Sequence, residues 1–391
     1  MNIAFFCIPA HGHTNPTLAV VRELTARGHT VRYYTTEAFR AKVETAGAVF
    51  VPFDAEAARP GMTAADGARL GSDLAFSTRL IVDLTLAADD WLSRELTVHR
   101  PDVIVGDSMA FWAKLAAKKH GIPFVSSTTT FAFNRFSAKV IEQNGAGFLQ
   151  FLLAQPRINR QLKRLRAAGY AVKSVFDIIA NDNETETVVY TSPDFQPCAD
   201  TFSEKYHFVG PLLRPAQSSF EKLPGRSLIY ISLGTVNNDA LPFYRACLAA
   251  FGGDPRFQLV LSAGTQADLA AFGPISENCT VRASVDQMAV LDCADVFLTH
   301  CGMNSASEGL WHGLPLVLYP QTPEQHGVAN RVAALGAGVP LTDPSADGIR
   351  RAVETALTDP SYRENAQKLA GSFRRCGGAA EAADAIEHAA N

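Results

Sequence analysis

Short apolar runs alternate with amphipathic segments along the whole chain. The apolar run at residues 3–8 predicts a buried strand, and the run at 31–35 predicts the next one. Between them, Asn15 and Pro16 fit the N-cap and the first position of a helix, and Gly28 fits its C-terminal stop. Because strands that alternate with crossover helices form parallel sheets, the pattern predicts an α/β fold.

One strand–turn–helix–strand unit occurs twice. In the first copy an apolar strand ends at Asp107, and a helix then leads to His-Gly-Ile-Pro at 120–123. In the second copy a strand reaches His300, and a helix leads to His-Gly-Leu-Pro at 312–315. Strand–helix–strand units often resemble one another, but this repeat favours two similar Rossmann-like domains. It places Asp107 and His300 at carboxyl ends of strands, the edge at which open α/β sheets bind ligands.

A chain of 391 residues is too long for one ordinary core. Pro, Gly and Ser cluster between the two copies of the repeat, which indicates a linker. We predict an N-terminal Rossmann-like domain, a linker, a C-terminal Rossmann-like domain, and a final helix that packs back on the N-terminal domain. Their ranges are 1–208, 209–225, 226–375 and 376–391.

Composition narrows the class of protein. Apolar residues make up 47% of the chain and charged residues 19%, as in a globular enzyme, and the net charge is −4. The tightest basic cluster, at 157–166, has the spacing of a solvated helix face, so we expect no nucleic-acid partner. No apolar run reaches the roughly 18 residues that a membrane span needs.

We expect a monomer or a homodimer.

The cysteines bear on the compartment. All seven stand apart, without a C-x-x-C pair, which favours reduced thiols in a cytoplasm. The first apolar run is too short for a signal peptide. We therefore expect a cytoplasmic protein, and we interpret Cys301 as a small filler rather than a nucleophile.

The segment from His300 to Glu308 carries the densest polar chemistry. A strand that turns through glycine into a helix directs free N–H groups and the positive helix end at one point, which suits a phosphate. The same residues also fit an ordinary helix start, because Ser305-x-x-Glu308 is a capping box with which any helix could begin. This segment alone favours neither the phosphate site nor the simple helix cap.

Two histidines follow the first strand, at His11 and His13. An imidazole is a good general base at neutral pH when a carboxylate holds its second nitrogen, and Asp107 ends a later strand of the same domain. A structural role is the alternative for both, and for His11 it is the favoured one. A His–Asp pair opposite a phosphate-binding helix would let a hydroxyl be deprotonated while a diphosphate leaves.

Three motifs together resemble a known family. They are Gly12-His13-Thr14-Asn15-Pro16, the stretch from Val285-Asp286-Gln287 through Thr299-His300-Cys301-Gly302-Met303-Asn304-Ser305, and Pro320-Gln321-Thr322-Pro323-Glu324-Gln325. The chain resembles the GT-B-fold UDP-glycosyltransferases. It is most similar to the bacterial macrolide and natural-product group, which is related to plant small-molecule UDP-glucosyltransferases. The resemblance covers essentially the whole chain, and its C-terminal part is the more specific.

The resemblance implies a role for each matching residue. His13 would take the proton of the acceptor hydroxyl, and Asp107 would orient it. Glu308 would hold the ribose hydroxyls, and Glu324 with Gln325 would hold those of the donor sugar. The full set implied to bind the nucleotide sugar is Thr235, Ser284, Val285, Gln287, His300, Gly302, Asn304, Ser305, Glu308, Glu324 and Gln325.

Two positions depart from the family pattern. Many relatives have a Trp that stacks on uracil where this chain has Ser284, so both UDP-sugars and dTDP-sugars remain candidate donors. The pair Glu324-Gln325 stands where the plant enzymes usually have Asp-Gln, although bacterial relatives often have the Glu.

The implied reaction is an inverting transfer of a sugar, glucose from UDP-glucose being the expected donor, to a hydroxyl of a small apolar or aromatic acceptor. The chain has no D-x-D sequence, so we expect neither a metal nor a cofactor beyond the UDP-sugar co-substrate. A UDP-sugar epimerase or hydrolase on the same fold is one alternative, and a non-catalytic nucleotide-sugar-binding partner protein is another. A dehydrogenase is disfavoured because no G-x-G-x-x-G follows the first strand.

Overall fold

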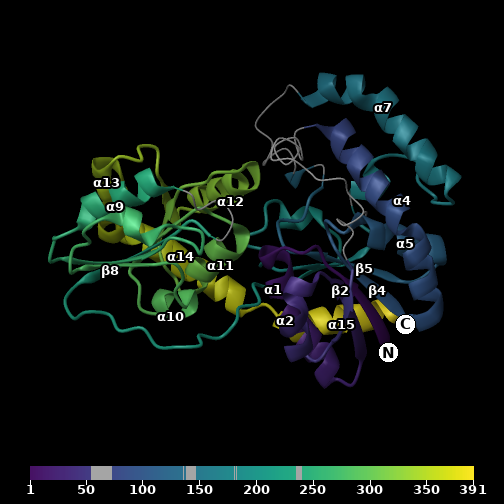
Figure 1. The fold of residues 1–391 in the computed structure, drawn as a ribbon, viewed down its shortest axis with the longest axis horizontal. Helices are drawn as coiled ribbons and strands as arrows, with labels where there is room; N and C mark the ends of the chain where they lie inside the picture. Colours follow the sequence, from purple (N-terminus) through teal and green to yellow (C-terminus); the bar gives the residue numbers. More distant parts are fainter. Residues whose placement is uncertain (54–72, 135, 138–146, 180, 182, 235–239) are drawn as a thin grey trace. The chain divides into compact units, whose positions relative to one another are not determined.

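The two parallel sheets predicted from the alternating pattern are present, each in its own part of the chain (Figure 1). The computed structural model describes residues 1–53, 73–134, 136–137, 147–179, 181, 183–234 and 240–391. Unit 1 comprises Met1–Leu212 with Gly377–Asn391, and unit 2 comprises Leu213–Cys376. The predicted α/β class, with one parallel sheet in each of two units, is therefore confirmed, and each unit is described by itself below.

Unit 1 is built on a seven-stranded, all-parallel sheet. In β1, Ile3 and Phe5 enter one apolar core while Ala4 and Phe6 enter another on the opposite face, so the sheet is covered on both sides. This double burial explains why the strand has no polar alternation. In sheet order the strands are β3 (Val49–Pro52), β2 (Thr30–Thr35), β1 (Asn2–Phe6), β4 (Val103–Asp107), β5 (Phe124–Thr128), β6 (Glu186–Val189) and β7 (Tyr206–Phe208).

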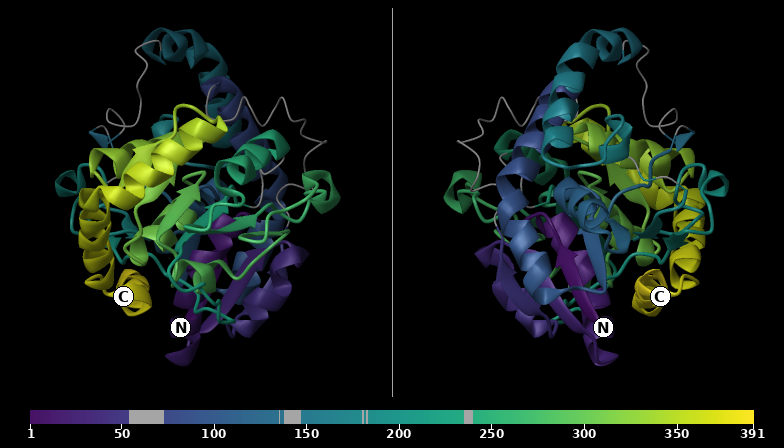
Figure 2. Two further views of the ribbon diagram at one scale, coloured as in Figure 1. Left: turned by 90° about the vertical axis from the view of Figure 1, so that its left-hand side faces the viewer. Right: turned by 90° about the vertical axis from the view of Figure 1, so that its right-hand side faces the viewer.

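The helices of unit 1 cover both faces of this sheet. In α7, Ile158, Leu162 and Leu165 are buried while Arg157 and Arg160 are exposed, which confirms the predicted solvated basic face. α7 lies along α4 (Figures 1 and 2). The helices are α1 (His11–Ala26), α2 (Arg40–Thr45), α4 (Leu74–His99), α5 (Phe111–His120), α7 (Gly147–Ala167), α8 (Phe176–Ile179) and α15 (Gly378–Ala390), with 3-10 turns η1 (Glu37–Phe39) and η2 (Ala199–Thr201).

The predicted start of the first helix is wrong. α1 begins at His11 rather than at Pro16, and its N-cap is Ala10. The carbonyl of Ala10 accepts from the N–H groups of both His13 and Thr14, at 3.0 and 2.9 Å, so the turn before the proline is already helical. Pro16 lies inside the helix, at its sixth position, where it contributes no N–H to the helical hydrogen bonds. His13 is thus held in the first helical turn.

The end of the chain belongs to unit 1. Ala382, Ala383 and Ile386 of α15 enter the same apolar core as Leu24 of α1. At the rim, the guanidinium of Arg27 donates to Asp384 at 2.6 Å and to Glu387 at 3.0 Å. His29 Nε2 lies 2.6 Å from the other oxygen of Glu387. Apolar packing and this ion cluster together fix α15 against α1.

Unit 2 is built on a six-stranded, all-parallel sheet. Its strands in sheet order are β10 (Cys279–Arg282), β9 (Phe257–Ser262), β8 (Ser227–Ser232), β11 (Val296–Thr299), β12 (Leu316–Leu318) and β13 (Gly338–Pro340). Its helices are α9 (Leu241–Phe251), α10 (Gln287–Leu291), α11 (Met303–Trp311), α12 (Pro323–Ala334), α13 (Ala346–Thr358) and α14 (Pro360–Arg374), with the 3-10 turn η3 (Leu269–Phe272).

The two sheets share one topology around their centres. In unit 1 the order reverses between β1 and β4, and in unit 2 it reverses between β8 and β11. Open α/β sheets bind ligands at such a switch point, beyond the carboxyl ends of the strands. Asp107 ends β4 and His300 directly follows β11, so the residues that the repeat picked out lie at the switch points of their units.

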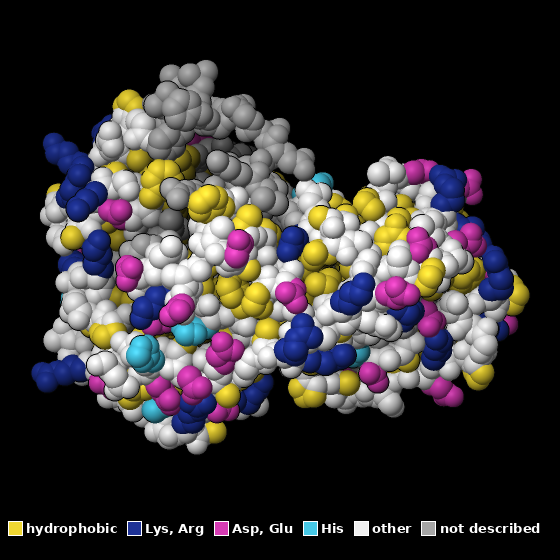
Figure 3. All heavy atoms as spheres, turned by 180° about the vertical axis from the view of Figure 1, so that it is seen from behind, with side chains coloured by type: hydrophobic (Ala, Val, Ile, Leu, Met, Phe, Trp, Pro, Cys, Tyr) yellow, Lys and Arg dark blue, Asp and Glu magenta, His cyan; other side chains and the backbone are white. Residues whose placement is uncertain are grey.

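The distribution of charged side chains on the surface agrees with the near-balanced charge of the sequence. On the face drawn in Figure 3, acidic and basic side chains alternate over each unit rather than forming a continuous basic band. Among the helices that the structure describes, none is both long enough and apolar enough to cross a membrane.

Candidate functional site

The candidate base of unit 1 is held by a buried carboxylate. His13 Nδ1 lies 2.7 Å from Asp107 Oδ2, and the Asp107 side chain is fully buried while that of His13 is 17% exposed. The backbone N–H of Met109 donates to the other oxygen of Asp107 at 2.9 Å, which fixes the carboxylate plane. A carboxylate can only accept, so Nδ1 carries the proton and Nε2 keeps a lone pair. Nε2 is therefore the basic nitrogen.

A third residue that the sequence did not indicate also contacts this ring. The buried hydroxyl of Thr129 lies 3.1 Å from His13 Nδ1. Thr129 directly follows β5, Asp107 ends β4, and His13 follows β1, so three adjacent strands supply the cluster. The adjacency of β1, β4 and β5 would have identified Thr129, but strand order is not written in the sequence.

Neighbouring groups in unit 1 serve packing. His11 is exposed, and its ring packs edge-on against Phe39 at 5.0 Å, which agrees with the structural role favoured for it. Cys7 is buried, and burial together with the charge of Asp107 raises the pKa of its thiol far above the ordinary range. A thiol held in its neutral form is no nucleophile.

The turn at His300 in unit 2 forms a helix N-terminus without the predicted capping box. Gly302 is the N-cap of α11 and provides no side-chain cap, and Ser305 lies in the first helical turn. Glu308 instead accepts a hydrogen bond from Gln287 Nε2. The capping-box interpretation is therefore wrong. Asn304 and Ser305 share the first turn, where backbone N–H groups have no carbonyl of their own helix to meet.

Two glycines make the space that the His300 ring occupies. A Cβ on Gly234 would lie 2.7 Å from the ring, and a Cβ on Gly302 would lie 2.6 Å from Nε2. Gly234 follows β8 and Gly302 follows β11, which pair in the sheet. Gly302 was among the predicted residues, whereas Gly234 was missed.

His300 is held neutral. Burial lowers the pKa of its imidazole to about 4, against a smaller opposing effect of the Ser232 backbone. Within the described part of the chain, its Nδ1 is buried without a hydrogen-bond partner. A neutral imidazole offers one N–H donor, which can bind a phosphate oxygen. Cys301 has a φ of 64° and its thiol pKa is raised by burial to about 12, as suits a filler.

Glu308 and Gln287, two of the predicted nucleotide contacts, are brought together by α11 and α10. Burial raises the pKa of Glu308, and the contact with Gln287 and the charge of Arg214 oppose this shift. Asp286, which directly precedes Gln287, accepts hydrogen bonds from the backbone N–H groups of Gln217 at 2.6 Å and Ser218 at 2.9 Å. The loop before α10 is thereby fixed to the start of unit 2.

Four of the remaining predicted residues lie in two further segments of unit 2. Ser284 is exposed and Val285 partly buried in the loop between β10 and α10. Glu324 is exposed in the first turn of α12, where the Gln325 side chain accepts from the Gln321 N–H at 2.8 Å. Thr235 lies outside the described residues.

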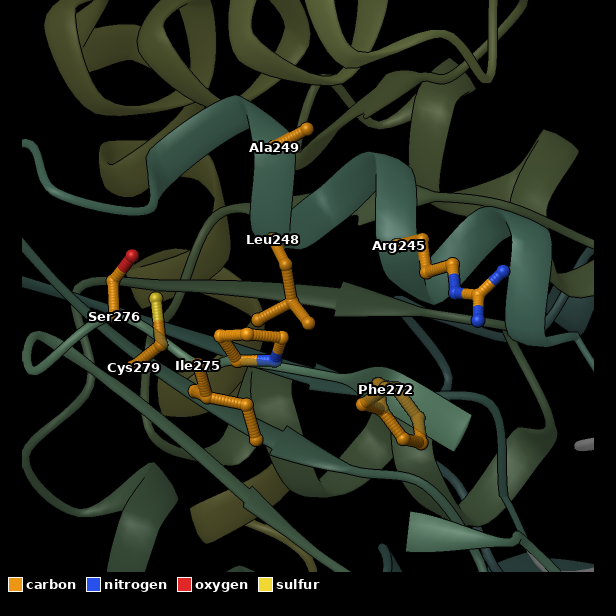
Figure 4. Close-up of a pocket in the computed structure, with 8 residues that line it drawn as sticks. Arg245, Leu248, Ala249, Phe272, Ile275, Ser276 and Cys279 are labelled. Atoms are coloured by element: carbon orange, nitrogen blue, oxygen red, sulfur yellow. The ribbon is translucent and has the colours of Figure 1, made fainter. Parts of the chain in front are cut away.

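A pocket elsewhere in unit 2 has different chemistry (Figure 4). It encloses about 250 Å³ between α9 and the segment 272–279, and none of the predicted site residues lines it. Its walls hold Leu248, Phe272 and Ile275 but no imidazole or carboxylate. Arg245, its one cation, donates to the carbonyl of Ala271 at 2.5 Å. It therefore lacks the groups that the transfer chemistry needs.

The described residues thus provide one cluster of polar side chains in each unit. Unit 1 holds a His–Asp–Thr cluster with one basic nitrogen, and unit 2 holds a helix N-terminus, a neutral imidazole and a carboxylate–amide pair. The first can accept a proton from a hydroxyl, and the second can bind an anion and a diol. No three His, Cys, Asp or Glu side chains of the described ranges come close enough together to hold a metal ion.

Comparisons with known proteins identify what the chain as a whole is similar to. Residues 228–374 match the family model described as UDP-glucoronosyl and UDP-glucosyl transferase. The chain is 33% identical to NDP-glycosyltransferase YjiC of Bacillus licheniformis, with 99% of this chain and 97% of that protein covered. It is 34% identical to demethyllactenocin mycarosyltransferase of Streptomyces fradiae, covering 99% and 86%. Among solved structures, the glycotransferase of kitacinnamycin matches with a TM-score of 0.86 at 30% identity, covering 99% and 98%.

Proposed function

The chain is a GT-B-type glycosyltransferase of the UDP-glucoronosyl and UDP-glucosyl transferase family, and from this premise we propose an inverting transfer that uses His13 as general base. The family resemblance predicted from the motifs is confirmed. The observation that carries the proposal is the 2.7 Å contact between His13 Nδ1 and the buried Asp107 carboxylate, which makes Nε2 the basic nitrogen of the ring.

The proposed reaction breaks one bond and forms another at the anomeric carbon. His13 Nε2 removes the proton of an acceptor hydroxyl as its oxygen attacks that carbon from the face opposite the diphosphate. The glycosidic C–O bond forms while the bond to the diphosphate oxygen breaks, and the configuration inverts. The Asp107 carboxylate stabilises the imidazolium that results. The proton leaves to solvent afterwards.

The donor is assigned to unit 2. The first turn of α11, with Asn304 and Ser305, and the neutral His300 ring would bind the diphosphate, whose negative charge the helix N-terminus favours. Glu308 and Gln287 would bind the ribose, and Glu324 with Gln325 the sugar hydroxyls. We propose UDP-glucose as the donor. Protein donors alone would hold the diphosphate, with no resident metal or cofactor.

The acceptor is assigned to unit 1, as a small apolar molecule with a free hydroxyl. Large apolar side chains are exposed on the segments that follow β4 and β5. Met109 is 50% exposed two residues after Asp107, and Phe133 is 51% exposed four residues after Thr129. Exposed apolar surface beside polar chemistry is typical of a ligand-binding face. Relatives with the names demethyllactenocin mycarosyltransferase and oleandomycin glycosyltransferase support a natural-product acceptor.

A panel of UDP-sugars and dTDP-sugars against phenolic, macrolide and terpenoid acceptors tests this proposal, with products detected by mass. The expected result is a hexose added to at least one hydroxyl acceptor from UDP-glucose. Transfer from dTDP-sugars alone would overturn the donor assignment. Release of UDP and a new free sugar epimer without any acceptor would instead favour an epimerase or hydrolase.

A further inference from the structure

Tyr230 is a buried residue of β8 whose hydroxyl lies within reach of the Ser232 and Ser262 side chains and also contacts Gln287, a predicted nucleotide contact. Its side chain is 1% exposed, and its ring stacks on Phe297 of the neighbouring strand at 4.9 Å and 18°. The packing in this part of the core therefore needs the ring alone. The hydroxyl extends further and donates to Gln287 Oε1 at 3.0 Å.

The contacts beyond Tyr230 form a hydrogen-bond chain with one direction. Tyr230 donates to the carbonyl oxygen of the Gln287 amide, and the amide nitrogen donates to Glu308 Oε2. A flipped amide would place its oxygen against the Glu308 carboxylate, where two acceptors would repel each other. The Glu308 carboxylate thus selects this orientation of the amide, and the hydroxyl of Tyr230 adds a second hydrogen bond that holds Gln287 in it.

Glu308 needs that support. Burial raises the pKa of its carboxyl, so the ionised form is costly where it lies. Arg214, whose charge favours the ionised form, is already paired with Asp286 at 2.8 Å. Gln287 supplies the hydrogen bond to Oε2, which leaves Oε1 as an acceptor for an incoming group. A buried, oriented carboxylate oxygen suits a neutral diol, which donates two O–H groups.

We propose that Tyr230 is a positioning residue for the donor nucleotide. Through Gln287 it holds Glu308 in the orientation and charge state that bind the ribose hydroxyls, and so it sets the preference of the enzyme for a nucleotide with a complete ribose. Tyr230 touches no substrate in this account and acts only through the other two residues. The inference rests on the proposed function, because it takes unit 2 as the donor site.

The test is calorimetric binding of UDP and of 2′,3′-dideoxy-UDP, which lacks both ribose hydroxyls, to the full chain and to Tyr230→Phe. The matched control is Tyr244→Phe. Tyr244 of α9 is 1% exposed, and its hydroxyl is buried with no hydrogen-bond partner among the described residues, so the control removes the same atom from the same unit. Melting curves of all variants check folding.

We expect Tyr230→Phe to weaken UDP binding by about fivefold to tenfold, the effect of one hydrogen bond to a functional network. Binding of 2′,3′-dideoxy-UDP should change by less than about twofold in that variant, so the ratio of the two affinities falls. Tyr244→Phe should keep the wild-type ratio. An equal loss for both nucleotides, or no loss, would overturn the inference.

A second variant keeps the test decisive if Tyr230→Phe folds poorly. Gln287→Ala breaks the same chain from its partly exposed middle and should lower the same ratio. In the Gln287→Ala background, Tyr230→Phe should have no further effect on the ratio, because the path to Glu308 is already cut. A retained ratio in Gln287→Ala overturns the inference. Failure of the wild-type protein to bind either nucleotide would instead overturn the proposed donor site.

Discussion

His13 and Asp107 lie 94 positions apart in the sequence, yet Nδ1 of the one is 2.7 Å from a carboxylate oxygen of the other. Parallel pairing of β1 with β4 brings them together, since each residue sits at or just beyond the carboxyl end of its strand. The pairing fixes the imidazole tautomer, and the tautomer decides which nitrogen can act as a base. Several consequences for mutants can be measured.

Asp107→Asn tests the role of this carboxylate. An amide of the same shape can present its NH2 group to Nδ1, which favours the tautomer in which Nε2 carries the proton and cannot accept one. We expect kcat for transfer to fall by about 10²–10⁴-fold while UDP affinity stays within about twofold of wild type. Steady-state kinetics and calorimetry measure the two quantities. Retention of wild-type kcat would contradict the assigned role.

Thr129→Val tests the third member of the cluster. Valine keeps the shape of the buried side chain but removes the hydroxyl that lies 3.1 Å from His13 Nδ1. One lost hydrogen bond predicts a fall in kcat of about twofold to tenfold, without a change in the KM for the donor. The adjacent Thr130→Val is the control, because its hydroxyl contacts the Phe131 carbonyl instead. Equal effects of both changes would refute a specific role for Thr129.

Gly302→Ala tests the space around His300. The backbone of Gly302 has a φ of −58°, which alanine adopts freely, so the added methyl acts only through its 2.6 Å approach to the ring. Displacement of His300 should weaken UDP binding by about tenfold or more. Gly371→Ala in α14 is the control; its Cβ would meet only the flexible end of Arg375 at 3.3 Å, and it should bind UDP normally.

The protonation of His300 predicts an acid-sensitive fold. Burial lowers the pKa of the ring from 6.5 to about 4, so the unfolded chain binds more protons than the folded protein between these values. The free energy of unfolding should therefore fall as pH falls from about 6.5 toward 4. Across that window His300 accounts for a loss on the order of 3 kcal/mol.

Urea unfolding of the wild type and of His300→Gln at pH 7, 5.5 and 4.5 measures this effect. Glutamine does not titrate, so the variant should lose less stability than the wild type as the pH is lowered. Identical pH slopes for the two proteins would show that His300 is not the group responsible.

Pattern and spacing predicted the parts of this molecule that depend on local sequence. Unbroken apolar runs gave two doubly covered parallel sheets, and the repeat placed Asp107 and His300 at strand ends. Two local signals differ from the structure: Pro16 fits a helix start, although the helix begins at His11, and the capping box that Ser305-x-x-Glu308 offered as one of two interpretations is not formed. At α1 the backbone turn onto the Ala10 carbonyl precedes the proline, and at α11 the Glu308 carboxylate contacts Gln287 of another helix instead of capping its own.

Thr129, Tyr230 and Gly234 were not predicted because their contacts depend on the order of the strands in each sheet, which cannot be read from the sequence. Thr129 reaches His13 from a strand two places away in the sheet, and Tyr230 reaches Gln287 from 57 positions earlier in the chain. Gly234 matters because it follows β8, the strand that pairs with β11 before His300. None of the three carries a motif of its own, so only the assembled sheets reveal them.

We propose that this glycosyltransferase uses His13 as the base for a transfer to a hydroxyl. Its most direct test compares His13→Ala with the wild type, measuring acceptor-dependent UDP release from UDP-glucose and the Kd for UDP in the same preparations. We predict a loss of transfer of about 10²–10⁴-fold with a nearly unchanged Kd. Full turnover in His13→Ala, with UDP still bound, would contradict the account.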